Sequence, residues 1–190
     1  QIPIKTFLNI AIQLADALSM IHHAQVIHKD LHPGNIIINP NTLSVQIIDF
    51  GLASLLSREQ PALTPPDSIE GVLSYISPEQ TGRMNRSLDY RSDFYTLGIT
   101  LYQLLTGKLP FVADDAMGLV HAHIARVQTP VCECRPEVPE AISNIIDKLM
   151  RKMAEERYQS AWGLKQDLEI CCQHVEADKT IPPFTLASQD

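Results

Sequence analysis

The sequence predicts a mainly α-helical fold that carries one small β-hairpin. Residues 4–23 repeat apolar side chains at i, i+3 and i+4, with polar residues on the opposite side. Residues 92–105 are apolar nearly all round, which indicates a helix buried in the middle of the domain. Two short apolar runs, 36–38 and 45–48, flank the turn-forming residues 39–42 and suit paired strands.

Size and charge limit the possible functions. The chain has 190 residues, enough for one domain with a full core. Its net charge of −7 argues against nucleic acid as the main partner. No apolar run approaches the ~20 residues of a membrane span, so we predict no membrane segment. The chain begins with Gln, without a secretory signal, and we interpret it as part of a longer protein.

The four cysteines occur as Cys132-x-Cys134 and Cys171-Cys172. Neither pair has the spacing or the accompanying histidines of a structural zinc site. His121 and His123 are two positions apart in a predicted helix, so they point to different faces and do not suit a metal site. We therefore predict reduced thiols in a cytoplasmic protein.

The remaining helices follow from periodicity and from their end signals. Ser92 is placed to cap the buried helix, and Gly107 is placed just past its end. Further helices are predicted over 114–127, after Pro139, and over 160–175 with Trp162 in the core. Residues 177–190 contain Pro182-Pro183 and no periodicity, which is typical of a linker.

The hairpin places polar residues at one mouth of a small sheet. If it is centred near Thr42, the antiparallel ladder sets Asn35 opposite Asp49. Amide and carboxylate oxygens held in this way suit a hard cation such as Mg²⁺, which also retains water and phosphate oxygens. Asp30, on the loop before the first strand, could accept the proton of an attacking hydroxyl.

These offsets form the pattern H-x-D-x-x-x-x-N followed by D-F-G, which resembles the catalytic loop and metal-binding motif of protein kinases. The resemblance covers residues 1–176 and implies the C-terminal lobe of a kinase domain, with 177–190 as a linker toward a downstream domain. Its N-terminal lobe is absent from this chain. HKDLHPGN, SPEQTGRMNRSLDYRSDFYTLG and AEERYQSAWGLKQDL look like the bacterial serine/threonine kinase domain that heads very large signalling proteins.

The resemblance implies ATP and Mg²⁺ as cofactors, a protein substrate, and ATPase, GAF and histidine kinase domains downstream. It also implies roles for individual residues. These are Asp30, His32 and Asn35 in catalysis, Asn35 and Asp49 at the metal, Asn35, Ile37 and Asp49 at the nucleotide, and His28, Phe50, Gly51, Glu79, Asp93 and Arg157 in structure. Asp93 would anchor the backbone of the catalytic loop, and Arg157 would pair with Glu79 of the Ser-Pro-Glu motif.

Residues 51–78 form a polar, proline-punctuated segment that is too long to be a mere connector. It resembles a kinase activation segment. The candidate phosphorylation sites are Ser54, Ser57, Thr64, Ser68 and Ser74. Lys29, where most relatives have Arg, is the cation expected to pair with an added phosphate, although an ammonium lacks the bidentate fork.

Two departures from the family pattern leave alternatives open. His32 stands where serine/threonine kinases carry Lys, and Val72 stands where they carry Thr. The eight glycines include no G-x-G-x-x-G, and no strand Lys of the V-A-I-K type occurs, so we expect the isolated chain to be nearly inactive. The alternatives are a pseudokinase or interaction module, and a small-molecule phosphotransferase, since Asp30-Leu31-His32-Pro33-Gly34-Asn35 also resembles the aminoglycoside and choline kinase loop.

Overall fold

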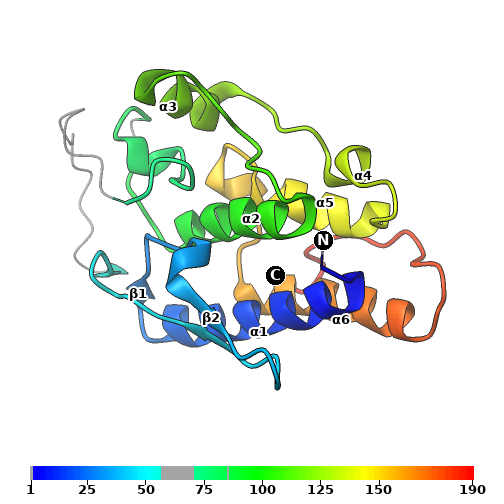
Figure 1. Ribbon diagram of the computed structural model, residues 1–190. Helices are drawn as coiled ribbons and strands as arrows, with labels where there is room; N and C mark the ends of the chain where they lie inside the picture. Colours follow the sequence, from blue (N-terminus) through cyan, green and yellow to red (C-terminus); the bar gives the residue numbers. More distant parts are fainter. Residues whose placement is uncertain (1, 57–70, 85) are drawn as a thin grey trace.

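The computed structural model describes residues 2–56, 71–84 and 86–190, and this part of the chain is mainly helical (Figure 1). The prediction of a helical domain with a small hairpin is confirmed. The α-helices are α1 (Ile4–His23), α2 (Arg91–Thr106), α3 (Ala116–Ala125), α4 (Val131–Cys134), α5 (Glu140–Leu149) and α6 (Ala161–Glu176). The strands are β1 (Val26–Ile27), β2 (Ile36–Ile38), β3 (Val45–Ile47) and β4 (Ser54–Leu55), and short 3₁₀ helices are η1 (Pro33–Asn35), η3 (Glu79–Thr81) and η4 (Ala154–Glu156).

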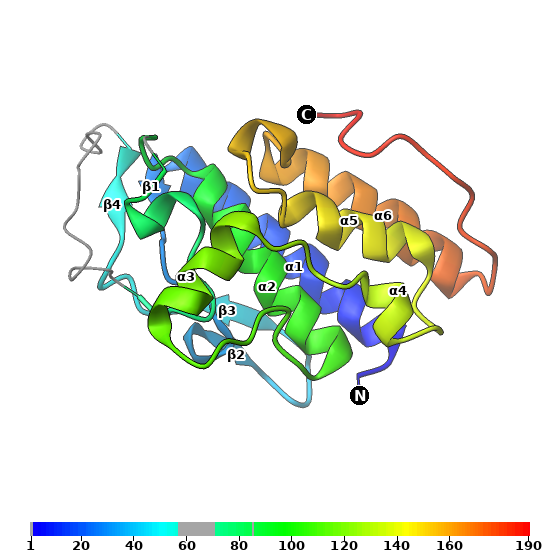
Figure 2. The ribbon, with the colours of Figure 1, turned by 90° about the horizontal axis from the view of Figure 1, so that it is seen from above.

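Helix α1 lies along α6 and buries one face in the core (Figure 2). The buried residues are Phe7, Leu8, Ile10, Ala11, Leu14, Ala15 and Leu18. Among the described residues α1 is the one helix long and apolar enough to cross a membrane, but its packing in the core accounts for that apolarity. Its bounds agree with the prediction because an amphipathic stripe is a local property of the sequence.

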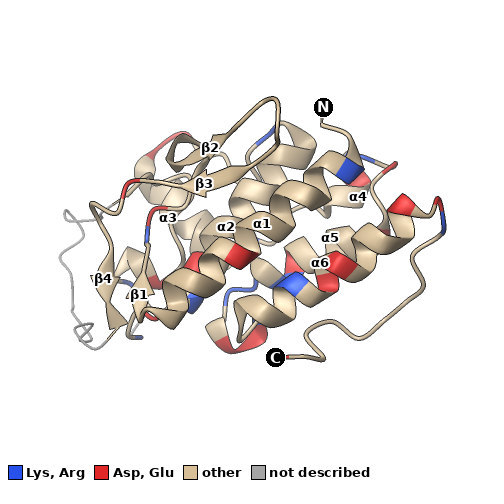
Figure 3. Cartoon of the chain, turned by 90° about the horizontal axis from the view of Figure 1, so that it is seen from below, with Lys and Arg blue, Asp and Glu red and all other residues tan. Residues whose placement is uncertain are grey.

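Charged residues of both signs are interspersed over α1 and α6 (Figure 3). Two ion pairs join the helices: Lys5 Nζ lies 3.3 Å from Glu176 Oε1, and Lys165 Nζ lies 2.7 Å from Asp16 Oδ1. Both carboxylates are more than half exposed to solvent, so each pair contributes at most about 1 kcal/mol. The apolar interface between the two helices therefore supplies most of their attraction.

Helix α2 is buried over nearly all its length, as predicted, and Gly107 ends it in the left-handed conformation with φ 75°. Its start differs from the prediction. The N-cap residue is Tyr90, and no side chain caps the helix. The hydroxyl of Ser92 instead donates to Glu79 Oε1 at 2.8 Å, because a buried carboxylate competes successfully for that donor.

Side-chain caps begin two of the other helices. Asp115 accepts a hydrogen bond from Gly118 N at the start of α3, and Ser160 accepts one from Gly163 N at the start of α6. Helix α3 is shorter at both ends than the predicted 114–127. The prediction that Trp162 lies in the core is wrong, since 54% of its surface is exposed. The first turn of α6 turns this side chain outward, and the core contacts come from Leu164, Leu168 and Cys171.

The β2–β3 hairpin forms, but its register differs from the prediction by one residue. Ile36 pairs with Ile47 and Ile38 with Val45, so Asn35 lies opposite Ile48 rather than Asp49. Ile48 N donates to Asn35 O at 2.9 Å. The cause is the loop of residues 39–44, in which Leu43 takes a positive φ of 56° and moves the centre of the hairpin toward Asn41. Asp49 therefore follows the strand as a separate left-handed residue, with φ 61°.

A second two-stranded sheet pairs β1 with β4, joining Val26 to Leu55 and Ile27 to Ser54. The sequence analysis did not predict it, because strands of two residues have no detectable periodicity. The pairing holds the chain on either side of the hairpin together. It thus places residues 28–35, the loop that resembles the kinase catalytic loop, beside the segment that follows Gly51.

Candidate active site

Asp93, in the first turn of α2, binds the backbone of the loop between β1 and β2. Asp93 is fully buried, and its Oδ2 and Oδ1 accept hydrogen bonds from His28 N at 2.9 Å and Lys29 N at 2.8 Å. His22 Nε2 completes the set, 2.9 Å from Asp93 Oδ2. Both oxygens of this carboxylate therefore have partners, as a buried charge requires. The result is a rigid loop in which Lys29 has φ 69°.

Asp30 and Asn35 lie side by side at the mouth of this loop. Asn35 Nδ2 donates to Asp30 O at 2.9 Å and to Asp30 Oδ2 at 3.0 Å. From the other side, Val72 N lies 3.4 Å from Asp30 Oδ1. The side chain of Asp30 is only 17% exposed, so its carboxylate has a defined direction and still reaches solvent. A carboxylate held in this way can accept a proton from a hydroxyl placed beside it.

His32 lies against Asp30 on the same loop. Its Nε2 is 3.5 Å from Asp30 Oδ2, and its Nδ1 accepts a hydrogen bond from Gly34 N at 3.1 Å. A Cβ on Gly34 would lie 2.7 Å from the imidazole, so glycine leaves the space that this ring occupies. The ring also lies beside that of Tyr75, with centroids 5.6 Å apart. His32 thus caps the start of η1 and also faces the carboxylate of Asp30.

Asp49, Phe50 and Gly51 form a tight turn after β3. Asp49 Oδ1 accepts from Gly51 N at 3.0 Å, which leaves Oδ2 for another partner. The ring of Phe50 packs edge-on against His28 at 4.8 Å, and His28 Nε2 lies 3.2 Å from Ile48 O. His28 therefore joins this turn to the catalytic loop.

Ile37 and Phe50 are large apolar side chains that lie on the surface. Ile37 is 50% exposed and Phe50 is 48% exposed. The sequence analysis assigns Ile37 to the nucleotide, where apolar contact with a base would cover it, and assigns Phe50 to structure, which agrees with its packing against His28.

Asn35 and Asp49 each offer a side-chain oxygen of the kind that binds magnesium. Asn35 uses its Nδ2 on Asp30, so its Oδ1 is the atom left to bind a cation. Asp49 offers Oδ2 in the same way. In the described parts of the chain no three His, Cys, Asp or Glu side chains cluster as metal ligands. Two protein oxygens, completed by waters and phosphate oxygens, are the ligand set typical of Mg²⁺ in phosphotransferases.

Glu79 and Arg157 form a buried ion pair behind the site. Arg157 Nη1 lies 2.6 Å from Glu79 Oε1, and Nη2 lies 2.9 Å from Oε2, so the pair is bidentate. Arg157 also donates to the carbonyl oxygens of Arg91, Arg151 and Lys152. This network fixes the end of the 51–78 segment to the helical core.

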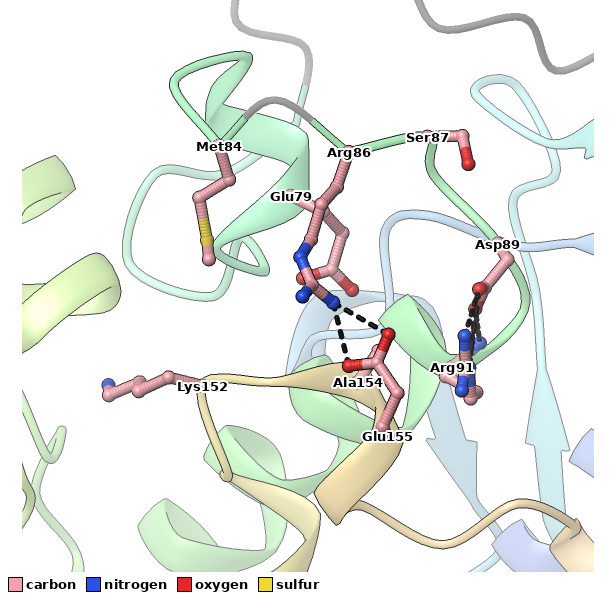
Figure 4. A pocket seen from close by; sticks show the side chains of 9 residues that line it. All are labelled: Glu79, Met84, Arg86, Ser87, Asp89, Arg91, Lys152, Ala154 and Glu155. Atoms are coloured by element: carbon pink, nitrogen blue, oxygen red, sulfur yellow. Dashed lines mark hydrogen bonds and ion pairs between the residues drawn. The ribbon is translucent and has the colours of Figure 1, made fainter.

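A cavity of about 400 Å³ opens beside this pair (Figure 4). Figure 4 shows Arg86 facing Glu155 across it, and Arg91 facing Asp89. The two arginines that line it are thus paired with carboxylates of the same lining, and Glu79 is paired with Arg157 behind it. We assign no ligand to this cavity.

Several residues that support the loop were not identified from the sequence. Gln80 Nε2 donates to Lys29 O at 2.8 Å, and Thr100 Oγ1 donates to Leu31 O at 3.0 Å. Gln80 directly follows the Ser-Pro-Glu motif, which is the only local signal for it. Thr100 lies in an apolar helix and has no signal at all, because its partner is 69 positions away.

Ser54 lies in β4, and Ser74 lies in a turn beside the catalytic loop. The other candidate phosphorylation sites, Ser57, Thr64 and Ser68, lie outside the described residues. Pairing of a phosphate with Lys29 therefore stays a prediction.

Comparison with known proteins identifies this arrangement. Residues 1–171 match the protein kinase domain family. The chain belongs to that family. This kinase domain is 37% identical to the serine/threonine-protein kinase pkn3 of Myxococcus xanthus, over 85% of the chain and 30% of that protein. It is 32% identical to PknB of Mycolicibacterium smegmatis, over 85% of the chain and 25% of that protein.

The kinase domain is also 32% identical to hybrid signal transduction histidine kinase G of Dictyostelium discoideum, over 89% of the chain and 7% of that protein. The chain thus spans less than a third of the length of each of these relatives. The predicted resemblance to bacterial serine/threonine kinases is confirmed by these matches.

Proposed function

We propose that this kinase domain serves a protein serine/threonine kinase, which transfers the γ-phosphate of ATP to a hydroxyl of a protein substrate. The observation that carries the proposal is the geometry at Asp30. Its carboxylate is held by the amide of Asn35 at 3.0 Å and lies on a loop whose backbone is bound to Asp93. Such an arrangement provides a positioned proton acceptor beside a place for a metal and phosphates.

In this mechanism Asp30 orients the attacking hydroxyl and accepts its proton. Asn35 keeps Asp30 in place and, with Asp49, would hold Mg²⁺, which supplies charge neutralisation on the phosphates. Val72 N, at 3.4 Å from Asp30 Oδ1, limits the directions in which the carboxylate can turn. Ile37 would contact the base of the nucleotide. Positioning and electrostatics supply most of the rate acceleration.

We expect the 190 residues alone to be nearly inactive, because nothing in their sequence corresponds to a glycine-rich loop or to the strand lysine of a kinase. The test is phosphotransfer from labelled ATP to a protein mixture by this kinase domain joined to its upstream sequence. Asp30→Asn is the negative control, since it keeps the size of the side chain and removes the base. Activity that survives Asp30→Asn would contradict the proposal.

A pseudokinase is the second candidate, and His32 favours it. In the family pattern this position carries the lysine that stabilises the γ-phosphate. Here the two imidazole nitrogens of His32 contact Gly34 N and Asp30. Binding of Mg-ATP by the extended protein, without transfer to any protein, would select this candidate.

A small-molecule phosphotransferase has less support. The resemblance assigns the Ser-Pro-Glu motif and Arg157 to kinases that act on proteins, and here Arg157 pairs with Glu79 of that motif. Assays with a protein mixture and, in parallel, with amino alcohols would separate the two activities.

Phosphorylation of the 51–78 segment is a further part of the proposal. Replacing every Ser and Thr from 54 to 74 by Ala in the extended kinase should lower its activity. Unchanged activity would exclude regulation at these positions. We also propose that the longer protein carries downstream sensor and ATPase domains, a proposal supported by the similarity to a hybrid histidine kinase.

A further inference from the structure

The last fourteen residues run back beside α6 instead of leaving the domain at the end of that helix (Figure 2). Helix α6 ends at Glu176, and yet Asp190 contacts Gln159 and Ser160, which precede the helix. The chain therefore retraces the helix, a distance of about 24 Å at 1.5 Å per residue. Residues 181–190, which we call the strap, make this return.

Apolar and polar contacts both hold the strap. Ile181, Phe184, Leu186 and Ala187 pack against the hydrophobic core. Ala187 N donates to Asp167 Oδ2 at 2.8 Å, and the same oxygen accepts from Tyr158 OH at 2.6 Å. Asp167 is buried, so its carboxylate needs these donors.

The carboxylate of Asp190 fits the start of α6. Its Oδ2 accepts from Gln159 N at 2.8 Å, and its Oδ1 accepts from Ser160 N at 3.0 Å and from Ser160 Oγ at 2.9 Å. A negative charge at this end of a helix is also favoured by the helix dipole. A Cβ on Gly163 would lie 2.3 Å from Asp190 Oδ1, so only glycine leaves room for it.

Residues 157–160, which we call the corner, bind Asp190 and also hold the end of the activation segment. Gln159 Nε2 donates to Arg157 O at 2.9 Å, and Gln159 Oε1 accepts from Arg91 Nη1 at 2.8 Å. Arg157, two residues before Gln159, makes the bidentate pair with Glu79. One run of four residues, 157–160, thus binds the strap at one end and Glu79 at the other.

We propose that the strap is a docked regulatory element. When seated, it fixes the 157–160 corner and with it the Arg157–Glu79 pair, and polypeptide that follows Asp190 can act on the kinase site by releasing it. The docking stands on the contacts above. Its effect on phosphotransfer rests on the proposed function.

The test is hydrogen exchange on the 190-residue chain with Asp190→Asn. Asparagine keeps the shape of the side chain and turns one acceptor into a donor that faces a backbone N–H. The loss of one such bond predicts exchange roughly three- to tenfold faster for amides of 159–163 and of 71–84. The matched control is Asp178→Asn, because Asp178 is exposed on the same tail and Asn tolerates its positive φ of 51°.

A second test compares the effect of Gly163→Ala on hydrogen exchange in two backgrounds, where we expect opposite effects. Gly163→Ala should speed exchange at 159–163, because the added methyl group displaces Asp190. With Asp190→Ala in place, Gly163→Ala should slow that exchange, since alanine favours helix when the carboxylate no longer blocks it.

Equal exchange in Asp190→Asn and Asp178→Asn would overturn the docking. A change confined to 159–163, with none at 71–84, would overturn the coupling to the activation segment. Faster exchange at both 159–163 and 71–84 would support the docked strap. If the extended protein also transferred no phosphate, that second result would contradict the proposed function and leave the strap supported.

Discussion

Asp93 accepts a hydrogen bond from Lys29 N at 2.8 Å and so holds Lys29 in a left-handed backbone conformation, with φ 69°. A non-glycine residue in this region costs free energy unless its surroundings stabilise it. The two residues are 64 positions apart in the sequence. The shape of the catalytic loop therefore depends on a carboxylate in α2, and not on the loop alone.

Asp93→Asn should destabilise the domain and loosen this loop. The NH₂ group of the new asparagine is a donor, and it would face one of the three donors that Asp93 now accepts from. These donors are His28 N, Lys29 N and His22 Nε2, and the site is buried. We expect a loss of about 1–3 kcal/mol in the free energy of unfolding, measured with urea. Asp16→Asn is the control, since Asp16 pairs with Lys165 at the surface and should cost less than about 1 kcal/mol. Equal losses for the two variants would contradict the role of Asp93.

Arg157→Met should cost about 3–5 kcal/mol of stability, because it leaves the carboxylate of Glu79 buried without its partner. The double variant Glu79→Met with Arg157→Met should recover part of that loss, since no uncompensated charge remains. Chemical unfolding of the two variants measures the difference. A double variant that is less stable than Arg157→Met alone would show that the other contacts of Glu79, such as Ser92, matter more than the pair.

His32→Lys should preserve or raise phosphotransfer in the extended kinase, because it restores the ammonium group that the family pattern places beside the γ-phosphate. The same change should lower stability by about 0.5–2 kcal/mol, since lysine cannot accept the hydrogen bond from Gly34 N. Steady-state kinetics and thermal unfolding test the two effects separately. A tenfold or larger fall in phosphotransfer would show that the imidazole has an essential role of its own.

His123 should make stability depend on pH in a defined window. Burial, with a smaller effect from Lys152, lowers the pKa of His123 from 6.5 to about 4. The unfolded chain thus takes up a proton below pH ~6.5 while the folded chain does not, so stability falls as the pH falls from about 6.5 to about 4. The total loss is on the order of 3 kcal/mol.

Urea unfolding at a series of pH values measures this loss. His123→Gln should flatten the slope in that window, because glutamine does not titrate. His121→Gln, at an exposed position of the same helix, should leave the slope unchanged. The lowered pKa of Lys152, about 8, acts in a separate alkaline range and does not interfere. An unchanged slope in His123→Gln would exclude His123 as the source.

Features that depend on neighbouring residues were predicted well. The bounds of α1 and the glycine that ends α2 follow from apolar spacing and from the conformational freedom of glycine, both of which act within a few residues. The hairpin was predicted with the correct strands and the wrong register. A one-residue difference in the loop is enough to shift the pairing of the strands. The free-energy difference between the two loops depends on backbone φ angles that the sequence does not specify.

The candidate residues of the site were predicted from the sequence itself, because the offsets among Asp30, Asn35 and Asp49 lie within one short stretch of the chain. Only the tertiary structure decided which distant groups support them. Asp93 under the loop, Arg157 on Glu79 and Asp190 at the start of α6 are contacts across 64, 78 and 30 positions. Burial selects such partners by requiring every enclosed charge to be paired, and no spacing along the chain records that selection.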